Sequence, residues 1–76
     1  MTILSDAPLD AALVLRRLGV PEAAGQRLRT LGLRPGARLR LLCKTVGGGR
    51  VAQVGETRVA LGAAVCRGLQ VEVVAR

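Results

Sequence analysis

The residues that could carry chemistry are few. The chain has two cysteines, Cys43 and Cys66, together with five acidic residues and no histidine. The cysteines are far apart and form no C-x-x-C pair, so they lack the partners of a metal site. The carboxylates show no paired spacing within one element, and no nucleophile has a base beside it. We therefore expect neither catalysis nor a bound metal or cofactor, and we interpret both thiols as small buried hydrophobic groups.

A glycine run at residues 47–49 has the composition of a phosphate-binding loop but not its sequence context. No G-K-[ST] follows the run, and no helix is expected to begin there. We interpret it as a flexible loop, which is the usual role of consecutive glycines.

The charge balance favours an acidic partner. Twelve basic residues stand against five acidic ones, which gives a net charge of +7. A field of one sign raises the encounter rate with nucleic acid, an anionic membrane face or an acidic protein. The chain has no Phe, Tyr or Trp, so it offers no platform on which the bases of a single strand could stack. A basic module that binds nucleic acid is kept as the alternative to a protein-binding domain.

Nothing in the sequence predicts export or membrane insertion. The first ten residues include Asp6 and Asp10 and no basic cluster, so they lack the cationic start of a secretory signal. No run of eighteen apolar residues occurs, since Arg16 and Arg17 interrupt one apolar stretch. We expect a cytoplasmic protein without a membrane-spanning segment.

These residues must be positioned by a small β-rich domain. The length of 76 residues suits one domain over residues 1–76. Alternating or apolar runs predict five strands, at 11–18, 37–44, 50–54, 57–61 and 69–74. Gly55 and Glu56 suit a two-residue type II′ turn, and residues 61–68 have room for one turn of helix. Residues 1–8 are expected to be loosely ordered.

One helix is predicted between the first two strands. It begins at Pro21, and Ala24, Leu28 and Leu31 recur at i, i+4 and i+7 as one apolar face. Arg27 is placed away from that face, where it is either a contact residue or a stem lying along the barrel.

The helix is predicted to stop at Gly32, because a residue at this position usually takes positive φ, which glycine adopts freely. Leu33 would then cover the last turn. Pro35 and Gly36 would form the next turn before the second strand.

In the second predicted strand, at residues 37–44, successive side chains are expected to alternate between the two faces of the sheet. Leu39, Leu41 and Cys43 are expected on one side, and Arg38, Arg40, Leu42 and Lys44 on the other. The second set is our candidate partner-binding face, because an apolar group flanked by cations suits an acidic, partly apolar partner. The alternative is a solvated face with Leu42 tucked under the helix or an adjoining loop.

Short antiparallel strands in so small a chain favour a partly open barrel. An OB-fold usually places its helix between the third and fourth strands, whereas an SH3-like barrel tolerates a helix after the first. We therefore predict an all-β fold with one short helix, a small five-stranded SH3-like barrel.

The run R-L-R-T-L-G-L-R-P-G at residues 27–36 resembles the R-L-x-x-L-G-L-x-P-G signature of the FeoA family. The likeness extends to Val59-Ala60-Leu61 and to Leu69-Gln70-Val71, which resemble the family's last two strands. It implies structural roles for one set of residues: Leu28, Leu31, Gly32, Leu33, Pro35, Gly36, Leu61, Cys66, Leu69 and Val71.

The same resemblance implies a function. FeoA proteins are small cytoplasmic SH3-like domains associated with a membrane ferrous-iron transporter that carries a cytoplasmic GTP-binding domain. The resemblance makes that GTP-binding domain the expected partner, with self-association left open. The same module also occurs in metal-dependent repressors, so contact with a transcriptional regulator is an alternative.

Three positions depart from the family pattern. Leu9-Asp10 stands where the family has Pro-Gly, Gly62 replaces the usual basic residue, and three glycines replace a proline-containing loop. These departures leave the expected fold intact and affect the expected binding surface.

Overall fold

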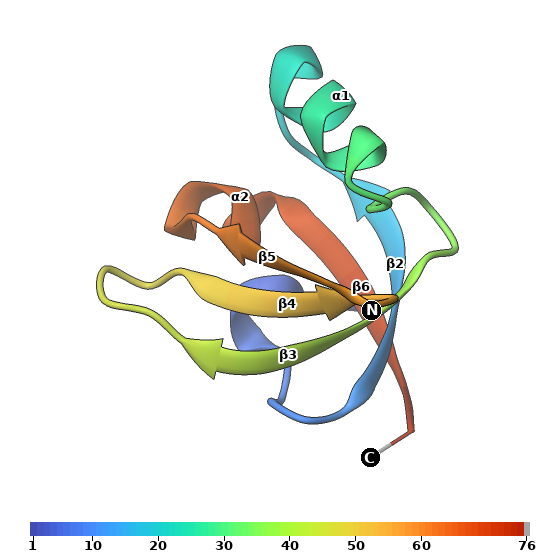
Figure 1. Ribbon diagram of the computed structural model, residues 1–76, viewed down its shortest axis with the longest axis vertical. Helices are drawn as coiled ribbons and strands as arrows, with labels where there is room; N and C mark the ends of the chain where they lie inside the picture. Colours follow the sequence, from blue (N-terminus) through green and yellow to red (C-terminus); the bar gives the residue numbers. More distant parts are fainter. Residues whose placement is uncertain (76) are drawn as a thin grey trace.

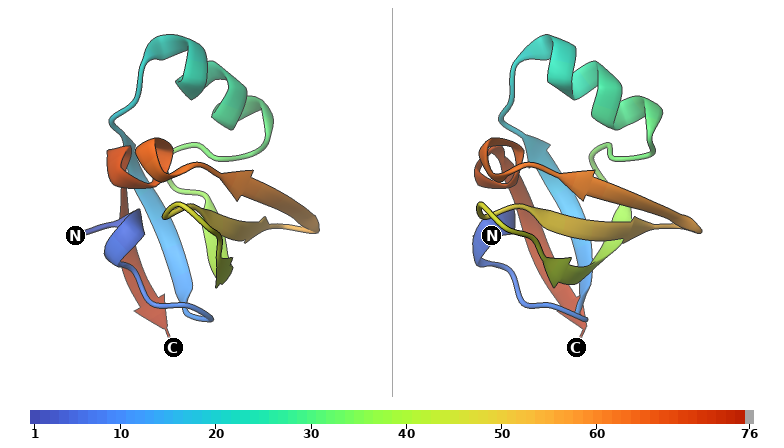
Figure 2. Two further views of the ribbon diagram at one scale, coloured as in Figure 1. Left: turned by 90° about the vertical axis from the view of Figure 1, so that its left-hand side faces the viewer. Right: turned by 60° about the vertical axis from the view of Figure 1, so that its left-hand side comes forward.

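The computed structural model describes residues 1–75 and contains one six-stranded antiparallel sheet (Figure 1). The elements follow in the order β1 (Thr2–Ile3), a 3-10 helix (Leu4–Asp6), β2 (Ala12–Leu18), α1 (Glu22–Thr30), β3 (Arg38–Lys44), β4 (Arg50–Val54), β5 (Thr57–Leu61), α2 (Ala63–Gly68) and β6 (Leu69–Ala75). The strands are ordered β1-β6-β2-β3-β4-β5. Figure 2 shows the sheet curling into a partly open barrel, with α1 standing above it.

The predicted fold class is confirmed, with one strand and one helix more than expected. The added strand is β1, in which Thr2 pairs with Val71 and Ile3 with Gln70. The added helix is α2, where the sequence predicted a single turn. The expectation that residues 1–8 are loosely ordered was wrong, because Leu4 is fully buried in the core. An apolar residue in a segment too short for periodicity gives no signal of this burial.

The core lies inside the curled sheet and consists of aliphatic side chains. The largest fully buried ones are Leu4, Leu13, Leu15, Leu33, Leu41, Cys66, Leu69 and Val71. Each buried leucine or valine contributes about 1.5–3 kcal/mol relative to an exposed one. Aliphatic burial at both ends of the chain therefore closes the barrel without aromatic residues.

The end of α1 follows the predicted glycine stop. Gly32 has φ 97°, and its N–H donates to the carbonyl of Arg29 at 3.0 Å. The N–H of Leu33 reaches back to the carbonyl of Leu28 at 2.9 Å. This pair of bonds is the Schellman arrangement, which satisfies carbonyls that the helix end leaves free. The buried Leu33 side chain then directs the chain back to the barrel.

Both predicted turns are present. Gly36 has φ 91°, and the N–H of Ala37 donates to the carbonyl of Arg34 at 2.9 Å, which closes the turn before β3. Gly55 has φ 60° in the two-residue turn between β4 and β5. Glycine at the first central position is what a type II′ hairpin turn requires.

The predicted faces of β3 were wrong beyond Leu41. A bulge interrupts the pairing with β4, so that Leu41 faces Ala52 while Cys43 faces Val51. One extra residue, Leu42, shifts the alternation by one position. Cys43 is consequently exposed rather than buried, and Leu42 is half-buried.

Lys44 pairs with Arg50 at the end of β3. The bulge therefore separates Lys44 from the outward face that carries Arg38 and Arg40.

In the described residues, no helix is both long and apolar enough to cross a bilayer.

Candidate functional site

The helix α1 stands off the barrel and leaves a groove beneath it. Within α1, the buried residues are Gly25 and Leu28. Leu31, one turn further along the same face, is 40% exposed although it is apolar. Figure 1 shows α1 projecting above β5 and α2, attached through its two connecting segments. The apolar face of α1 is thus only partly used for packing.

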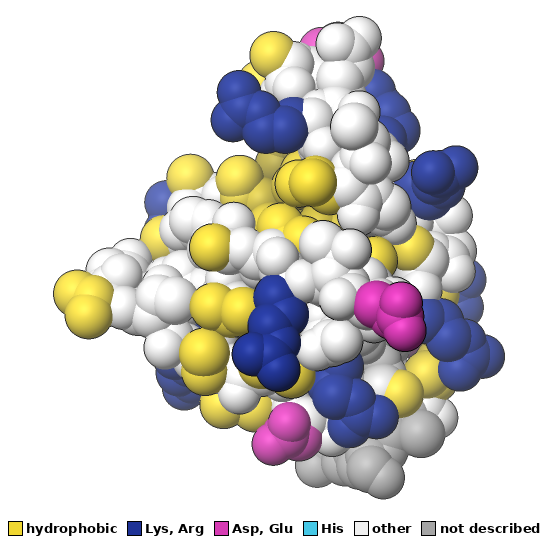
Figure 3. Space-filling view, in the orientation of Figure 1, with side chains coloured by type: hydrophobic (Ala, Val, Ile, Leu, Met, Phe, Trp, Pro, Cys, Tyr) yellow, Lys and Arg dark blue, Asp and Glu magenta, His cyan; other side chains and the backbone are white. Residues whose placement is uncertain are grey.

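The groove has a volume of about 180 Å³ and lies between α1, β5 and α2. Its lining is mostly apolar: Ala24, Arg27, Leu28, Leu31, Val59, Ala60, Leu61, Gly62 and Val65. Figure 3 shows hydrophobic side chains gathered between the projecting helix and the body of the molecule, with basic side chains on the helix beside them. An apolar floor with a basic rim is the anatomy of a protein-binding surface.

Arg27 borders this groove, which corrects its predicted placement away from the apolar face. On a helix, residues three and four positions apart are neighbours. Arg27 is therefore adjacent to Ala24 and Leu31, and its exposed side chain stands at the edge of their face. A cation at the rim of an apolar groove adds positive potential there, which is complementary to acidic groups.

Gly62 lines the far end of the groove and leaves it open. A Cβ built at this position would meet no atom within 4 Å. Its φ of −69° is one that any residue adopts. Glycine at this position therefore leaves its part of the groove free of a side chain, and its backbone is unstrained.

The predicted partner-binding residues of β3 lie on a different surface. Arg38 and Arg40 line a shallow depression beside Ala12 and Gln53. Arg40 is also engaged within the molecule, because its Nη1 donates to the carbonyl of Asp10 at 2.6 Å. The structure therefore places Arg27 in the groove and the β3 arginines in this second depression.

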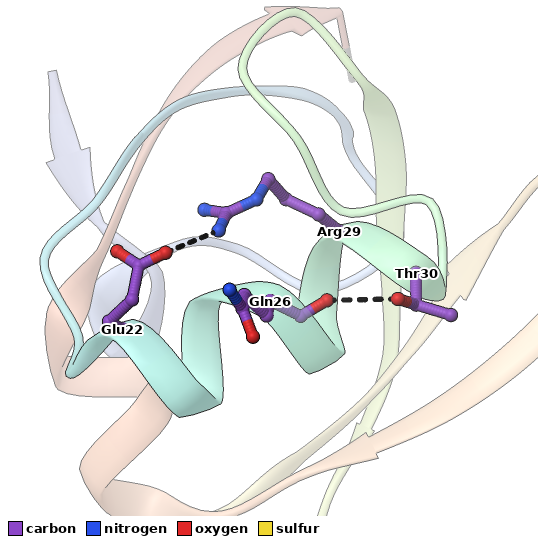
Figure 4. A network of polar contacts seen from close by, with 4 residues as sticks. All are labelled: Glu22, Gln26, Arg29 and Thr30. Atoms are coloured by element: carbon purple, nitrogen blue, oxygen red, sulfur yellow. Dashed lines mark hydrogen bonds and ion pairs between the residues drawn. The ribbon is translucent and has the colours of Figure 1, made fainter.

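A third depression is formed by polar residues of α1 and the loop after it. It is lined by Gln26, Arg29, Thr30 and Arg34 and is open to solvent. Figure 4 shows its polar contacts: Arg29 pairs with Glu22 at 2.9 Å, and Thr30 donates to the carbonyl of Gln26 at 3.0 Å. Exposed ion pairs of this kind contribute about 0–1 kcal/mol. These contacts support α1, and the four residues that line the depression do not form a recognisable catalytic or metal-binding arrangement.

Arg50 is a buried cation that the sequence did not single out. It is 8% exposed, and its guanidinium donates to the carbonyls of Gly48, Gly49 and Ser5 at 2.7–3.0 Å. The glycine loop and the N-terminal segment are thereby joined through one side chain. Nε is buried without an acceptor in the described residues. The sequence gives no local pattern that distinguishes Arg50 from the other basic residues, so its burial could not be predicted.

The two thiols differ in environment. Cys66 is fully buried, and its Sγ lies 3.7 Å from the carbonyl of Leu61. Burial raises the pKa of the Cys66 thiol, and the nearby Arg50 opposes this shift in part. Within residues 1–75, no three metal-ligating side chains lie together.

The chain resembles known proteins over most of its length. A family model described as the FeoA domain matches residues 2–73. No curated protein matches the chain. Among solved structures, the zinc-complexed FeoA of Stenotrophomonas maltophilia, described as a prokaryotic SH3 domain protein, is 31% identical with a TM-score of 0.77. That match covers 95% of this chain and 91% of that one.

Two further structures support the same assignment. An iron uptake regulatory protein (FeoA) is 25% identical with a TM-score of 0.82, covering 93% of this chain and 95% of that one. Iron(II) transport protein A of Clostridium thermocellum is 23% identical with a TM-score of 0.86. Here 96% of this chain spans only 46% of that protein, so the likeness concerns the fold. From the match over residues 2–73 and these shared structures, we conclude that the chain belongs to the FeoA domain family.

Proposed function

We propose that this protein is an accessory factor of ferrous iron transport that binds the cytoplasmic GTP-binding part of a membrane ferrous-iron transporter. The observation that carries the proposal is the open groove under α1, in which Leu31 remains 40% exposed. Membership of the FeoA family supports the iron-transport role, as does the Stenotrophomonas maltophilia protein, described as a candidate ferrous iron transport activating factor.

The groove supports binding rather than catalysis. Its lining contains one ionisable side chain, that of Arg27, and no acid, base or nucleophile. Its volume is also below the roughly 300–1,000 Å³ of sites for small molecules. An apolar floor of this size suits one or two side chains of a partner protein.

Iron enters this proposal as the transporter's cargo. Within residues 1–75, no three potential metal ligands lie together. The contribution of this protein would be contact with the transporter, assisted by a net charge of +7 that speeds encounter with acidic surfaces.

The proposal is tested by measuring binding to the purified cytoplasmic GTP-binding domain of the transporter. Leu31→Asp places a charge on the groove floor, and we expect at least a tenfold weaker affinity. Leu9→Asp is the matched control, since Leu9 is 38% exposed and lies outside the groove. It should bind like the wild type. Absence of wild-type binding, or equal loss in both variants, would contradict the proposal.

A further inference from the structure

We propose that an extended, acidic segment of the partner protein pairs with the free edge of β5 and adds a seventh strand to the sheet beneath α1. This inference rests on the proposed function for the identity of the partner. Its own content is the mode of recognition, which is main-chain pairing along β5 combined with apolar side chains in the groove.

The first observation is the unpaired edge of β5. In the sheet order β5 is terminal and pairs only with β4. Val54 and Thr57 close the two-residue turn, so they form a hydrogen-bonded pair, and the alternation continues along the strands. Arg58 and Ala60 consequently direct their N–H and C=O groups away from β4. No backbone bond to another segment occupies these groups in residues 1–75.

The second observation is that the groove runs along this edge. It contacts Val59, Ala60 and Leu61, which are consecutive residues of β5. Their side chains alternate between the two faces of the sheet, so a surface that meets all three lies at the edge between the faces. Across the groove lie Leu28 of α1 and Leu31, which directly follows α1. A strand added here would place every second side chain near this apolar floor.

The third observation is that this edge is protected only in part. Proteins commonly keep edge strands very short or cover them with a helix or loop. The opposite edge follows the first course, because β1 has two residues. At β5 the strand has five residues, and α1 stands beside the edge with a half-exposed leucine. Only Arg58 places a charge on the strand itself.

Charge selects the occupant. Arg27 lines the groove, and Arg58 and Arg67 are exposed on β5 and α2. Antiparallel pairing with the β5 strand of a second copy would place the two Arg58 side chains close together on the same face of the sheet. Their like charges would repel each other. An aspartate or glutamate in the added strand would instead face Arg58 favourably. The edge therefore suits an acidic partner better than another copy of this chain.

The inference is tested by removing one main-chain donor. Ala60→Pro deletes the outward N–H of Ala60, while the φ of proline suits an edge strand and the bonds of β4 remain. Ala60→Val is the matched control, because it adds similar bulk and keeps the donor. We expect affinity for the transporter's GTP-binding domain to fall at least tenfold in Ala60→Pro and by a clearly smaller factor in Ala60→Val, which adds bulk to the groove but keeps the donor.

Amide hydrogen exchange on the wild type tests the same point without a variant. Addition of the GTP-binding domain should slow exchange at Arg58 and Ala60, whose amides are free in the unbound protein. Binding with unchanged exchange at both amides, or with equal affinity in the two variants, would overturn strand addition and leave the proposed function standing.

Failure of the transporter domain to bind the wild type would instead remove the proposed function. Strand addition is then tested alone with a synthetic peptide in which glutamate alternates with valine or leucine. We expect millimolar peptide to slow exchange at Arg58 and Ala60 in the wild type, and a matched lysine peptide to have no effect. No slowing with the glutamate peptide would overturn the inference.

Discussion

Gly32 controls the point at which α1 turns back towards the barrel. Its φ of 97° lies in a backbone region that residues with a Cβ rarely adopt. A Cβ added to Gly32 would lie 3.4 Å from Cγ1 of Val54. This residue could be predicted from sequence, because a glycine after an apolar helical face is a local signal. The buried role of Arg50 could not, since its partners are carbonyl groups of residues both near and distant in the chain.

Gly32→Val should lower the free energy of unfolding by about 1–2 kcal/mol or more, because a β-branched side chain is disfavoured at positive φ. Urea unfolding of the variant and the wild type provides the measurement. Gly62→Val is the control, since Gly62 has φ −69° and open space around its Cβ. A Gly32→Val variant as stable as Gly62→Val would argue against the observed helix end.

The pKa of Cys66 gives a pH dependence with a defined sign. Burial raises this pKa in the folded state, so at alkaline pH the unfolded chain loses the proton first. The contribution of the protonated Cys66 thiol to the free energy of unfolding is therefore complete below the pKa of the unfolded thiol. It is lost as the pH rises through the pKa of the folded thiol. We expect the wild type to lose more stability between pH 7 and pH 10 than Cys66→Ala, measured by urea unfolding. Equal losses in both proteins would contradict this assignment.

At the scale of elements, α1 and β3 differ in how far their patterns predicted their structure. The helix has Pro21 before it, a 3.6-residue period and Gly32 after it, and it was placed correctly. The alternation in β3 predicted the strand but not the bulge after Leu41, because no glycine or proline marks the extra residue. Cys43 and Lys44 were assigned to the wrong faces for that reason. The groove lies between segments distant in sequence and has no local signal.

Leu28 is the main apolar anchor of α1, so its loss should release the helix. We expect Leu28→Ala to cost about 2–5 kcal/mol and to speed amide exchange in α1 more than in β3 and β4. Leu31→Ala is the matched control on the same face, and with Leu31 already 40% exposed its effect on stability should be much smaller. Similar destabilisation by the two variants would mean that both leucines anchor α1.

The whole molecule carries a net charge of +7, distributed over surfaces outside the groove as well as within it. Such a field acts on the rate of encounter and is screened by salt over about 8–10 Å. The exposed arginines Arg38 and Arg40 on β3 are separate from the groove and are suited to steering the proposed partner before it docks.

Reversal of Arg38 and Arg40 to Glu should slow association with the transporter's GTP-binding domain and leave the dissociation rate nearly unchanged. The difference should shrink as salt is raised from low to physiological concentration. Reversal of Arg17 and Arg34 changes the net charge equally and serves as the control. An equal slowing by both pairs would show that total charge, rather than the β3 face, governs encounter.

The pairing of β6 with both β1 and β2 has a consequence for synthesis of the protein. Ribosomes add residues at about 5–20 per second, in order from the N-terminus. Until residues 69–75 have been made, β1 has no partner, and β2 can pair only with β3. The segment of β1 therefore stays unpaired until β6 has been made, and the barrel can close only when β6 has left the ribosome.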